Sequence, residues 1–326
     1  MQIWRKFADV PPSPETSANV AFRRAYFARW GRENAVFHAA TCRWECAPVV
    51  APLTIKATIR GASWFTINGR RVLLDDEHFV VINAGDSYGV SIRSDTPVLG
   101  FSISVRPGLE QEVAAGLQRT SEGALDDGAI ARTAPVHFAG HLREHDASIM
   151  PALQAIRGAV LSGVVEDDWY EEAYADLVTR LIESDHGRKR LADRLDGVKP
   201  STREELLRRI GWATDFINSR YMEAISLDDI ARAASLSKFH LARLFRQGLG
   251  ITPHQYLQRR RTQVARRLID TTDMDVNEVA LTAGFGSRWT MYRFLRRSFG
   301  TGGRGLRRDL TARPAPCRPE PTPAAG

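Results

Sequence analysis

Two short segments near the carboxy-terminal end each carry a pair of arginines three residues apart. Arg243 and Arg246 form the first pair, and Arg293 and Arg296 occupy the equivalent positions of the second. The guanidinium group is planar and presents paired N–H donors, which match phosphate oxygens and the O6 and N7 atoms of guanine. The residue types and their spacing therefore predict two equivalent surfaces that bind nucleic acid.

Positive charge is concentrated in the same part of the chain. The 326 residues carry 45 Lys and Arg against 38 Asp and Glu, a net charge of +7. Residues 201–311 hold 20 basic and 11 acidic side chains, so the rest of the chain is slightly acidic. This asymmetry predicts a polyanionic partner for one region, although a solvated basic surface would have the same composition.

An internal repeat positions the arginine pairs. Residues 226–235 match residues 275–284, and each copy opens with a capping residue followed three positions later by an acid. Small alanines recur on one face of both copies: Ala231, Ala234, Ala280 and Ala283. A tight turn and a second N-cap, Ser237 or Ser287, follow. This order predicts two helix-turn-helix units.

The second helix of each unit carries its arginines outward. Residues 238–246 and 288–296 place an apolar stripe inward and the arginines on the opposite face. Between the units, Pro253 fits the first turn of a helix reaching about Asp270, roughly 27 Å long. Its predicted outward residues are Arg259, Arg260, Arg261, Arg266 and Arg267. Such a helix would hold two recognition helices about one DNA turn apart, roughly 34 Å.

Residues 210–300 resemble the AraC/XylS class of transcription regulators. The motifs that carry the resemblance are Leu227-x-x-Ile230-Ala231, Leu236-Ser237-x-x-His240-Leu241-x-Arg243-Leu244-Phe245-Arg246, Gly250-x-Thr252-Pro253-x-x-Tyr256 and Ala283-Gly284-Phe285-x-Ser287. The resemblance implies a DNA-binding domain of seven helices, preceded by a cupin-like sensor barrel and dimerising helices. Trp289, Met291 and Leu295 depart from the usual pattern, as do the glycines that interrupt the final helix after Gly300.

The resemblance also implies roles for individual residues. Implied base contacts are Phe239, Ala242 and Arg243 in the first unit, and Arg288, Trp289, Thr290 and Arg293 in the second. Arginine would pair with guanine, and the aromatic rings would touch thymine methyl groups. Phosphate contacts are expected at Ser237, Lys238, Arg246 and Arg296. Each arginine among the implied base contacts could instead bind a phosphate group or make no contact with DNA.

The amino-terminal part alternates apolar and polar residues over short segments. Strands are expected within residues 50–106, with a hairpin turn at Asn68-Gly69 and a break at residues 94–97. This pattern is typical of a small barrel or sandwich. Trp64, Phe65, Tyr88 and Phe101 are candidate residues of an effector pocket, with ordinary core packing as the alternative.

The period then becomes helical. Two apolar stripes, one from Met150 to Val164 and one from Trp169 to Ile182, predict an antiparallel helical pair. The pair would cover the barrel or form a dimer interface, and we favour the dimer. The predicted domains are a sensor at 1–141, a dimerisation segment and linker at 142–200, a DNA-binding domain at 201–311 and a disordered tail at 312–326. The fold class is therefore α+β: a cupin-like barrel with a helical pair, then an all-α domain.

Other chemistry is poorly supported. His137, His141 and His145 have helical spacing for a metal, but Pro135 and Gly140 interrupt any helix there, so no metal or cofactor is expected. His78 is the only histidine of residues 53–105, which argues against a metal-dependent cupin enzyme. Three cysteines form no disulfide framework. No apolar run is long enough to cross a membrane, and no signal peptide is recognised.

These observations predict a cytoplasmic, sequence-specific DNA-binding transcription regulator that is not an enzyme. Its expected partners are double-stranded DNA, a small-molecule effector, a second copy of the chain and RNA polymerase. Two alternatives from other classes remain open: a cupin-type enzyme tethered to DNA, and a non-specific nucleic-acid binder.

Overall fold

A computed structural model describes residues 2–7, 31–122, 136–145, 147–163, 166–192 and 200–299. The chain divides into two compact units, which are described separately below. The first unit contains residues 1–219 and 228–250, and the second contains residues 220–227 and 251–326. The predicted tail, the glycines after Gly300 and Cys317 lie outside the described residues.

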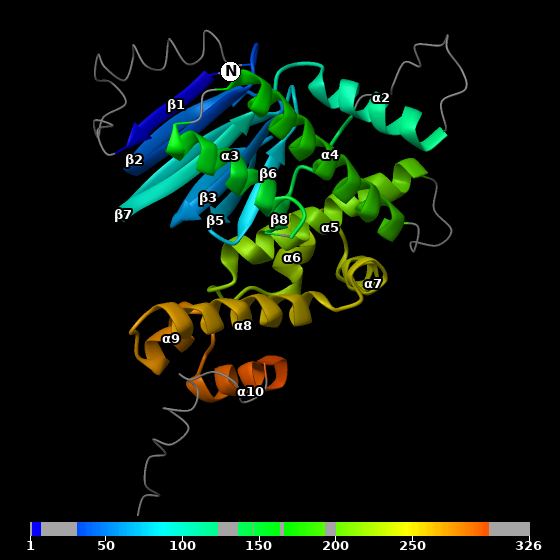
Figure 1. The fold of residues 1–326 in the computed structure, drawn as a ribbon. Helices are drawn as coiled ribbons and strands as arrows, with labels where there is room; N and C mark the ends of the chain where they lie inside the picture. Colours follow the sequence, from blue (N-terminus) through cyan, green and yellow to red (C-terminus); the bar gives the residue numbers. More distant parts are fainter. Residues whose placement is uncertain are drawn as a thin grey trace, which may run out of the picture. The chain divides into compact units, whose positions relative to one another are not determined.

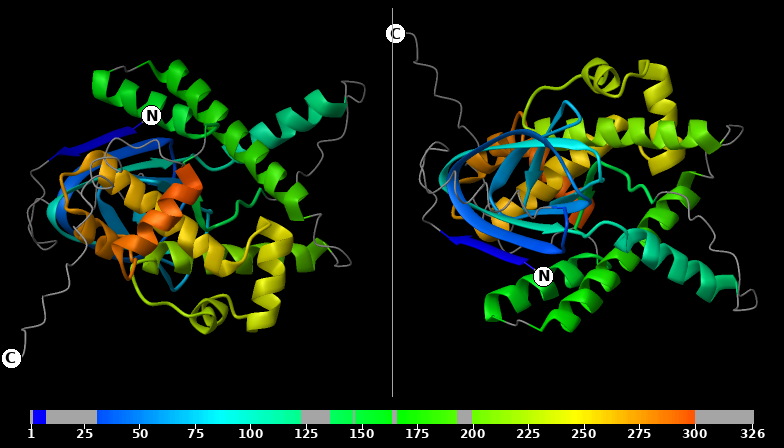
Figure 2. Two further views of the ribbon diagram at one scale, coloured as in Figure 1. Left: turned by 90° about the horizontal axis from the view of Figure 1, so that it is seen from below. Right: turned by 90° about the horizontal axis from the view of Figure 1, so that it is seen from above.

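A curved sheet of eight strands occupies the amino-terminal part of the first unit (Figures 1 and 2). Its strands are β1 (Gln2–Phe7), β2 (Ala35–Val50), β3 (Thr54–Arg60), β4 (Ala62–Ile67), β5 (Arg70–Asp75), β6 (His78–Ile82), β7 (Ser87–Ser104) and β8 (Leu142–Glu144). The main path runs β1-β2-β7-β3-β6-β8, while β4 pairs with β5 and β7. Only β1 and β2 are parallel. The predicted barrel-like architecture is confirmed.

Of the two interruptions predicted within the barrel strands, the structure contains one as a turn and not the other. Asn68 and Gly69 have φ angles of 47° and 77°, as the predicted hairpin turn between β4 and β5 requires. The predicted break at residues 94–97 is wrong, because β7 runs through it as one strand of 18 residues. The pairing of β7 with β2 continues on both sides of these residues, with a register shift between Thr41↔Val98 and Arg43↔Arg93, so the predicted break is an irregularity within one strand.

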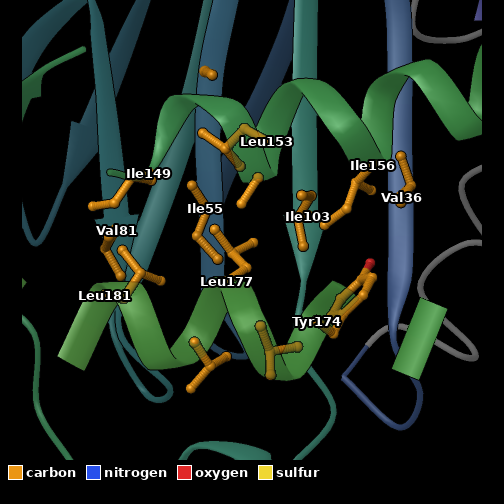
Figure 3. Close-up of a cluster of buried hydrophobic side chains, with 14 of the residues drawn as sticks. Val36, Ile55, Val81, Ile103, Ile149, Leu153, Ile156, Tyr174, Leu177 and Leu181 are labelled. Atoms are coloured by element: carbon orange, nitrogen blue, oxygen red, sulfur yellow. The ribbon is translucent and has the colours of Figure 1, made fainter. Parts of the chain in front are cut away.

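The two faces of the sheet have separate apolar cores. Ile55, Val81 and Ile103 point to the outer face, where helices α3 (Met150–Ser162) and α4 (Asp167–Ala192) cover them (Figure 3). Alternate residues point to the inner face and form a second cluster, which includes Phe65, Val72, Leu74, Val80 and Tyr88. This alternation is what a sheet with two packed faces requires.

The predicted helical pair exists, and its apolar stripes pack on the sheet. Leu153 and Ile156 of α3, with Tyr174, Leu177 and Leu181 of α4, are at most 2% exposed in the outer core. Of the two alternatives that the sequence left open, these contacts favour covering the barrel. Dimerisation stays a prediction and would use other surfaces.

One helix, α2 (Leu109–Glu122), was not predicted from the sequence. The remaining helices lie in the carboxy-terminal part, where helices were expected. The first unit also contains α5 (Pro200–Arg220), α6 (Leu227–Ala233) and α7 (Lys238–Leu249). The second unit contains α8 (Pro253–Thr271), α9 (Val276–Thr282) and α10 (Arg288–Phe299). The predicted α+β class is confirmed. Among the described residues, no helix is both long and apolar enough to span a bilayer.

Candidate nucleic-acid interface

Helices α6 and α7 form the first predicted helix-turn-helix unit. Ser237 caps α7, and its side chain accepts a hydrogen bond of 3.3 Å from the His240 backbone N–H. The turn before it places Ser235 at a positive φ of 54°, and Gly250 closes α7 at a φ of 71°. Ala231 and Ala234 are at most 3% exposed. The Ser237 cap and the small-residue face of the first unit are therefore confirmed, while the cap predicted at Ser226 stays a prediction.

Helix α7 buries one face and leaves the opposite face in solvent. Leu241, Leu244 and Phe245 are at most 1% exposed, whereas Phe239 is 87% exposed. Arg243 and Arg246 are also exposed, and Ala242 is half-buried between these two faces. Phe239 and Arg243 are four residues apart on the helix, so the exposed ring and the arginine predicted to contact bases share this face.

Helices α9 and α10 repeat the arrangement in the second unit. Asp275 and Glu278 form the predicted capping box of α9. Ser287 accepts a hydrogen bond of 3.2 Å from the Thr290 N–H. Met291 and Leu295 are fully buried in the core of this unit, so they take over the inward positions despite their departure from the family pattern.

The exposed face of α10 carries the same kinds of side chain as that of α7. Trp289 is 59% exposed and corresponds in position to Phe239. Arg293 and Arg296 are exposed, and Arg288 and Thr290 are half-buried. The Arg288 guanidinium lies 5.2 Å from the centre of the Trp289 ring, so these two predicted base contacts are adjacent.

Helix α8 corrects one prediction and confirms another. Pro253 lies in its first turn, and Thr252 with Gln255 forms a capping box, as the sequence indicated for this helix start. Arg260 is only 3% exposed, against the prediction that it points outward. It lies over the Tyr221 ring at 5.2 Å, because the neighbouring segment 220–227 packs on this face of α8. Arg261 is also bound there, donating to the carbonyl oxygens of Tyr221 and Glu223 at 2.7 and 2.8 Å.

Neighbouring charged side chains affect two residues of the first helix-turn-helix unit, Lys238 and His240. Lys238, a predicted phosphate contact, forms an exposed ion pair of 3.1 Å with Asp228. Phosphate binding would exchange this carboxylate for another anion at little cost, because exposed ion pairs contribute little. The pKa of His240 is lowered by burial and by the nearby Arg243 and Arg209. Both effects favour the neutral form of His240.

Two arginines that the sequence did not single out hold the turn of the first unit. Arg209 of α5 donates to the Ser235 carbonyl oxygen at 2.5 Å. Arg70, which follows the Asn68-Gly69 turn, donates to the Ala233 carbonyl oxygen at 3.0 Å. Ala233 is the last residue of α6 and Ser235 lies in the turn after it, where helix geometry leaves carbonyl groups without intrahelical partners. No sequence pattern points to Arg70, because it lies 163 residues from its acceptor.

The predicted effector-pocket residues lie on two faces of the barrel sheet. Phe65 and Tyr88 stack at 6.2 Å between ring centres and belong to the inner cluster. Phe101 belongs to the outer cluster beneath the helices. Trp64 is half-buried, with the Arg71 guanidinium 4.2 Å from its ring centre. The structure therefore brings together Phe65 and Tyr88 out of the four.

The three histidines considered as metal ligands have other surroundings. His141 is 6% exposed and packs against Gly211 of α5. Burial lowers the pKa of His145, and hydrogen bonding to His78 partly opposes this effect. Across the described ranges, no cluster of three or more His, Cys, Asp or Glu side chains has the arrangement of a metal site.

Comparison with known proteins identifies the same region. A family described as a helix-turn-helix domain matches residues 230–308. Probable transcription factor PqrA from Proteus vulgaris is 35% identical over 79 residues, which are 24% of this chain and 65% of PqrA. The transcriptional activator RhaS from Escherichia fergusonii is 34% identical over 103 residues, covering 32% of this chain and 36% of RhaS. The chain therefore spans less than two thirds of the length of these relatives.

One solved structure covers a similar share of the chain. An AraC-type regulator from Chromobacterium violaceum has 29% identity and a TM-score of 0.27, covering 31% of this chain and 87% of the other. The family-matched residues 230–308 include Ser237 and Ser287, the buried alanines of both units and the exposed faces of α7 and α10. Residues 230–308 of this chain are therefore similar to the helix-turn-helix domains of transcription regulators such as PqrA and RhaS.

Proposed function

We propose that the chain is a cytoplasmic, sequence-specific DNA-binding transcription regulator and not an enzyme, with a sensor barrel that binds a small molecule. One observation carries the proposal. Two capped helices, α7 and α10, expose an aromatic ring and arginines at equivalent positions: Phe239 with Arg243, and Trp289 with Arg293. Arginine reads guanine edges and aromatic rings contact thymine methyl groups, so this pair of surfaces suits two base-reading helices.

The contacts of α5 support regulation by the barrel. One face of α5 bonds to the barrel: Ser219 accepts from the Leu73 N–H at 2.9 Å, and Asp215 accepts from the Leu142 N–H at 2.8 Å. The Trp212 ring lies 3.3 Å from the Arg70 guanidinium. These are specific polar contacts between a barrel edge and the helix that precedes the first helix-turn-helix unit.

The other face of α5 supports α7 directly. Ile210 and Ile217 are at most 5% exposed, and a Cβ placed on Gly248 of α7 would lie 3.0 Å from Ile210 Cδ1. The absence of a side chain at Gly248 lets the two helices approach closely. A change at the barrel edge would therefore reach the first recognition helix through one rigid element, provided that the effector favours one of two arrangements.

Substitution of Arg243 tests sequence-specific binding. The duplex would be selected from a random pool by the wild-type chain, and its dissociation constant compared with that of a random duplex at one salt concentration. We expect Arg243→Ala to weaken binding of the selected duplex by about 1–3 kcal/mol, roughly 5- to 150-fold, and to change random binding far less.

Arg246→Ala is the matched control, because Arg246 is exposed on the same helix and is a predicted phosphate contact. Its affinity should fall by a similar factor for both duplexes, with a shallower dependence on salt. Equal losses for both duplexes in Arg243→Ala would contradict base reading and support a non-specific nucleic-acid binder. Turnover of a substrate by the purified chain would instead support the tethered enzyme.

We further propose that two copies of the chain associate, so that paired domains bind paired DNA sites, and that the bound regulator contacts RNA polymerase. Closed twofold dimers are the commonest assembly of soluble proteins, and symmetric operators mirror them. Sedimentation of the chain with and without duplex measures the stoichiometry. A 1:1 complex on the selected duplex at all concentrations would exclude the dimer.

A further inference from the structure

The inner face of the barrel contains one buried amine. Lys56 lies on β3 directly opposite Ser102 of β7 and Val80 of β6, so all three share the inner face. Only 8% of Lys56 is exposed. Lysine is rarely buried to this extent unless a counter-ion or a function retains it.

The amine has a neutral partner rather than an anionic one. Lys56 Nζ donates to the Tyr88 hydroxyl at 3.1 Å and lies 4.5 Å from the centre of the same ring. Within the described part of the chain, no carboxylate forms an ion pair with Lys56. Two other polar groups of this face are Cys46, which is 8% exposed, and Ser102, whose Oγ has no hydrogen-bond partner among the described residues.

Burial changes the protonation of this amine. Desolvation lowers the pKa of Lys56 to about 7, with the Cys46 sulfur as a smaller, opposing influence. An exposed lysine has a pKa of about 10.4. A pKa this low makes a substantial fraction of the Lys56 amine neutral and nucleophilic at pH 7, against fewer than about one in a thousand for an exposed lysine.

The surrounding side chains define the chemical class of ligand. The inner cluster beside Lys56 contains Phe65, Ile82 and Tyr88. A neutral amine in an apolar setting, next to a hydroxyl that can pass a proton, is the arrangement used by lysines that form Schiff bases. A carboxylate ligand would instead require a charged amine.

We propose that Lys56 binds a small aldehyde with an apolar chain as a reversible imine, with Tyr88 as the positioning and proton-transfer group. This inference rests on the proposed sensor function and specifies its effector. The Nζ lone pair attacks the carbonyl carbon, and the carbonyl oxygen takes up a proton to give a carbinolamine. The nitrogen then loses its remaining proton, and the hydroxyl group leaves as water. The C=N bond replaces C=O without oxidation or reduction.

The test uses the full chain, hexanal as the probe and cyanoborohydride to trap any imine as a stable secondary amine. The chain has five lysines, so peptide mass spectrometry assigns each labelled site, and exposed Lys238 is the internal reference. At pH 7 we expect Lys56 to be labelled about 10- to 100-fold faster than Lys238, because its neutral fraction is larger while its intrinsic nucleophilicity is lower. The labelling rate of Lys56 should reach half of its high-pH maximum near pH 7. The labelling rate of Lys238 should still rise steeply as the pH increases above that value.

Two variants separate reaction at Lys56 from general modification. Tyr88→Phe keeps the ring and removes the hydroxyl, and it should slow labelling of Lys56 about 10-fold without changing that of Lys238. Lys56→Met keeps an apolar chain of similar length, and hexanal treatment should leave its DNA affinity unchanged. Circular dichroism establishes that each variant is folded before it is compared.

DNA binding gives the readout that separates this inference from the proposed function. Trapping of hexanal at Lys56 should change the affinity of the wild-type chain for its selected duplex several-fold. Equal labelling of Lys56 and Lys238, or labelling of Lys56 with unchanged DNA affinity, would overturn the aldehyde proposal while the untreated chain still binds DNA. A shift in DNA affinity with hexanoate but not with hexanal would identify a carboxylate ligand and overturn it as well. Failure of the untreated chain to select any duplex would overturn the proposed function, whatever the labelling.

Discussion

The two helix-turn-helix units share their sequence pattern but differ in how the turn between the helices is held. In the first unit, Ser235 takes the left-handed conformation, and side chains of α5 and of the barrel bind the turn. In the second unit, Gly284 takes the equivalent position at a φ of 78° and lies against the backbone of Tyr221 and Met222. The same turn is thus stabilised by bound side chains in one copy and by close backbone packing in the other.

This difference is informative about regulation. A turn held by side chains of a sensor domain is one whose stability that domain can alter. A turn held by backbone packing within its own unit depends on that unit alone. We therefore expect an effector in the barrel to act on the first unit and to leave the second unit unchanged.

The strongest test makes the second turn resemble the first. In Gly284→Ser, the new Cβ would overlap the Tyr221 carbonyl oxygen and lie 2.8 Å from Met222 Cα. The backbone cannot move away cheaply, so we expect a loss of about 3 kcal/mol or more in the free energy of unfolding of this unit. Urea denaturation followed by circular dichroism measures it. A loss below about 1 kcal/mol would show that the close packing is not required.

A smaller effect is expected where α5 meets the barrel. A Cβ on Gly211 would lie 2.8 Å from the His141 ring. Gly211→Ala should therefore lower the free energy of unfolding of the compact unit that contains the barrel and α5 by about 1–2 kcal/mol. The matched control is Gly187→Ala in α4, where nothing lies within 4 Å of the added Cβ. That change should stabilise by about 0.5–1 kcal/mol, as is usual for glycine to alanine within a helix. Stabilisation by both substitutions would mean that α5 does not dock on the barrel.

The smallest effect should come from making the first turn resemble the second. Ser235→Gly removes the steric cost of a left-handed serine and adds flexibility to the unfolded chain, so the two contributions partly cancel. We expect stabilisation of less than about 1 kcal/mol, since Arg209 binds the carbonyl group of this residue and not its side chain. Thermal unfolding should therefore show a midpoint within a few degrees of wild type. A marked destabilisation would show that the Ser235 side chain makes a stabilising contact.

Features set by neighbouring residues could be predicted from the sequence, and those set by distant partners could not. Ser237, Ser287 and Pro253 are recognisable because a helix end depends on four or five consecutive residues. The inward position of Arg260 depends on the ring of Tyr221, which lies on another segment. The continuity of β7 on both sides of residues 94–97 depends on its pairing with β2, a distant partner that the local turn signal does not reveal.

The candidate site divides in the same way. The exposed arginines and aromatic rings follow from helical periodicity, so their accessibility was predictable once the repeat was recognised. Arg70 and Arg209 were missed because their acceptors are backbone carbonyl groups, which leave no trace in the residue types. The face on which Phe101 lies depends on strand register, and one residue of shift exchanges the two faces of a strand.

The exposure of Phe239 and Trp289 has a consequence for how binding responds to solution conditions. Phosphate contacts weaken as salt rises because they displace condensed counterions, whereas burial of an aromatic ring releases only water. Complex formation should therefore retain a component that persists at high ionic strength, accompanied by a negative change in heat capacity. Replacing either ring by alanine would remove part of that component while leaving the slope against salt unaltered.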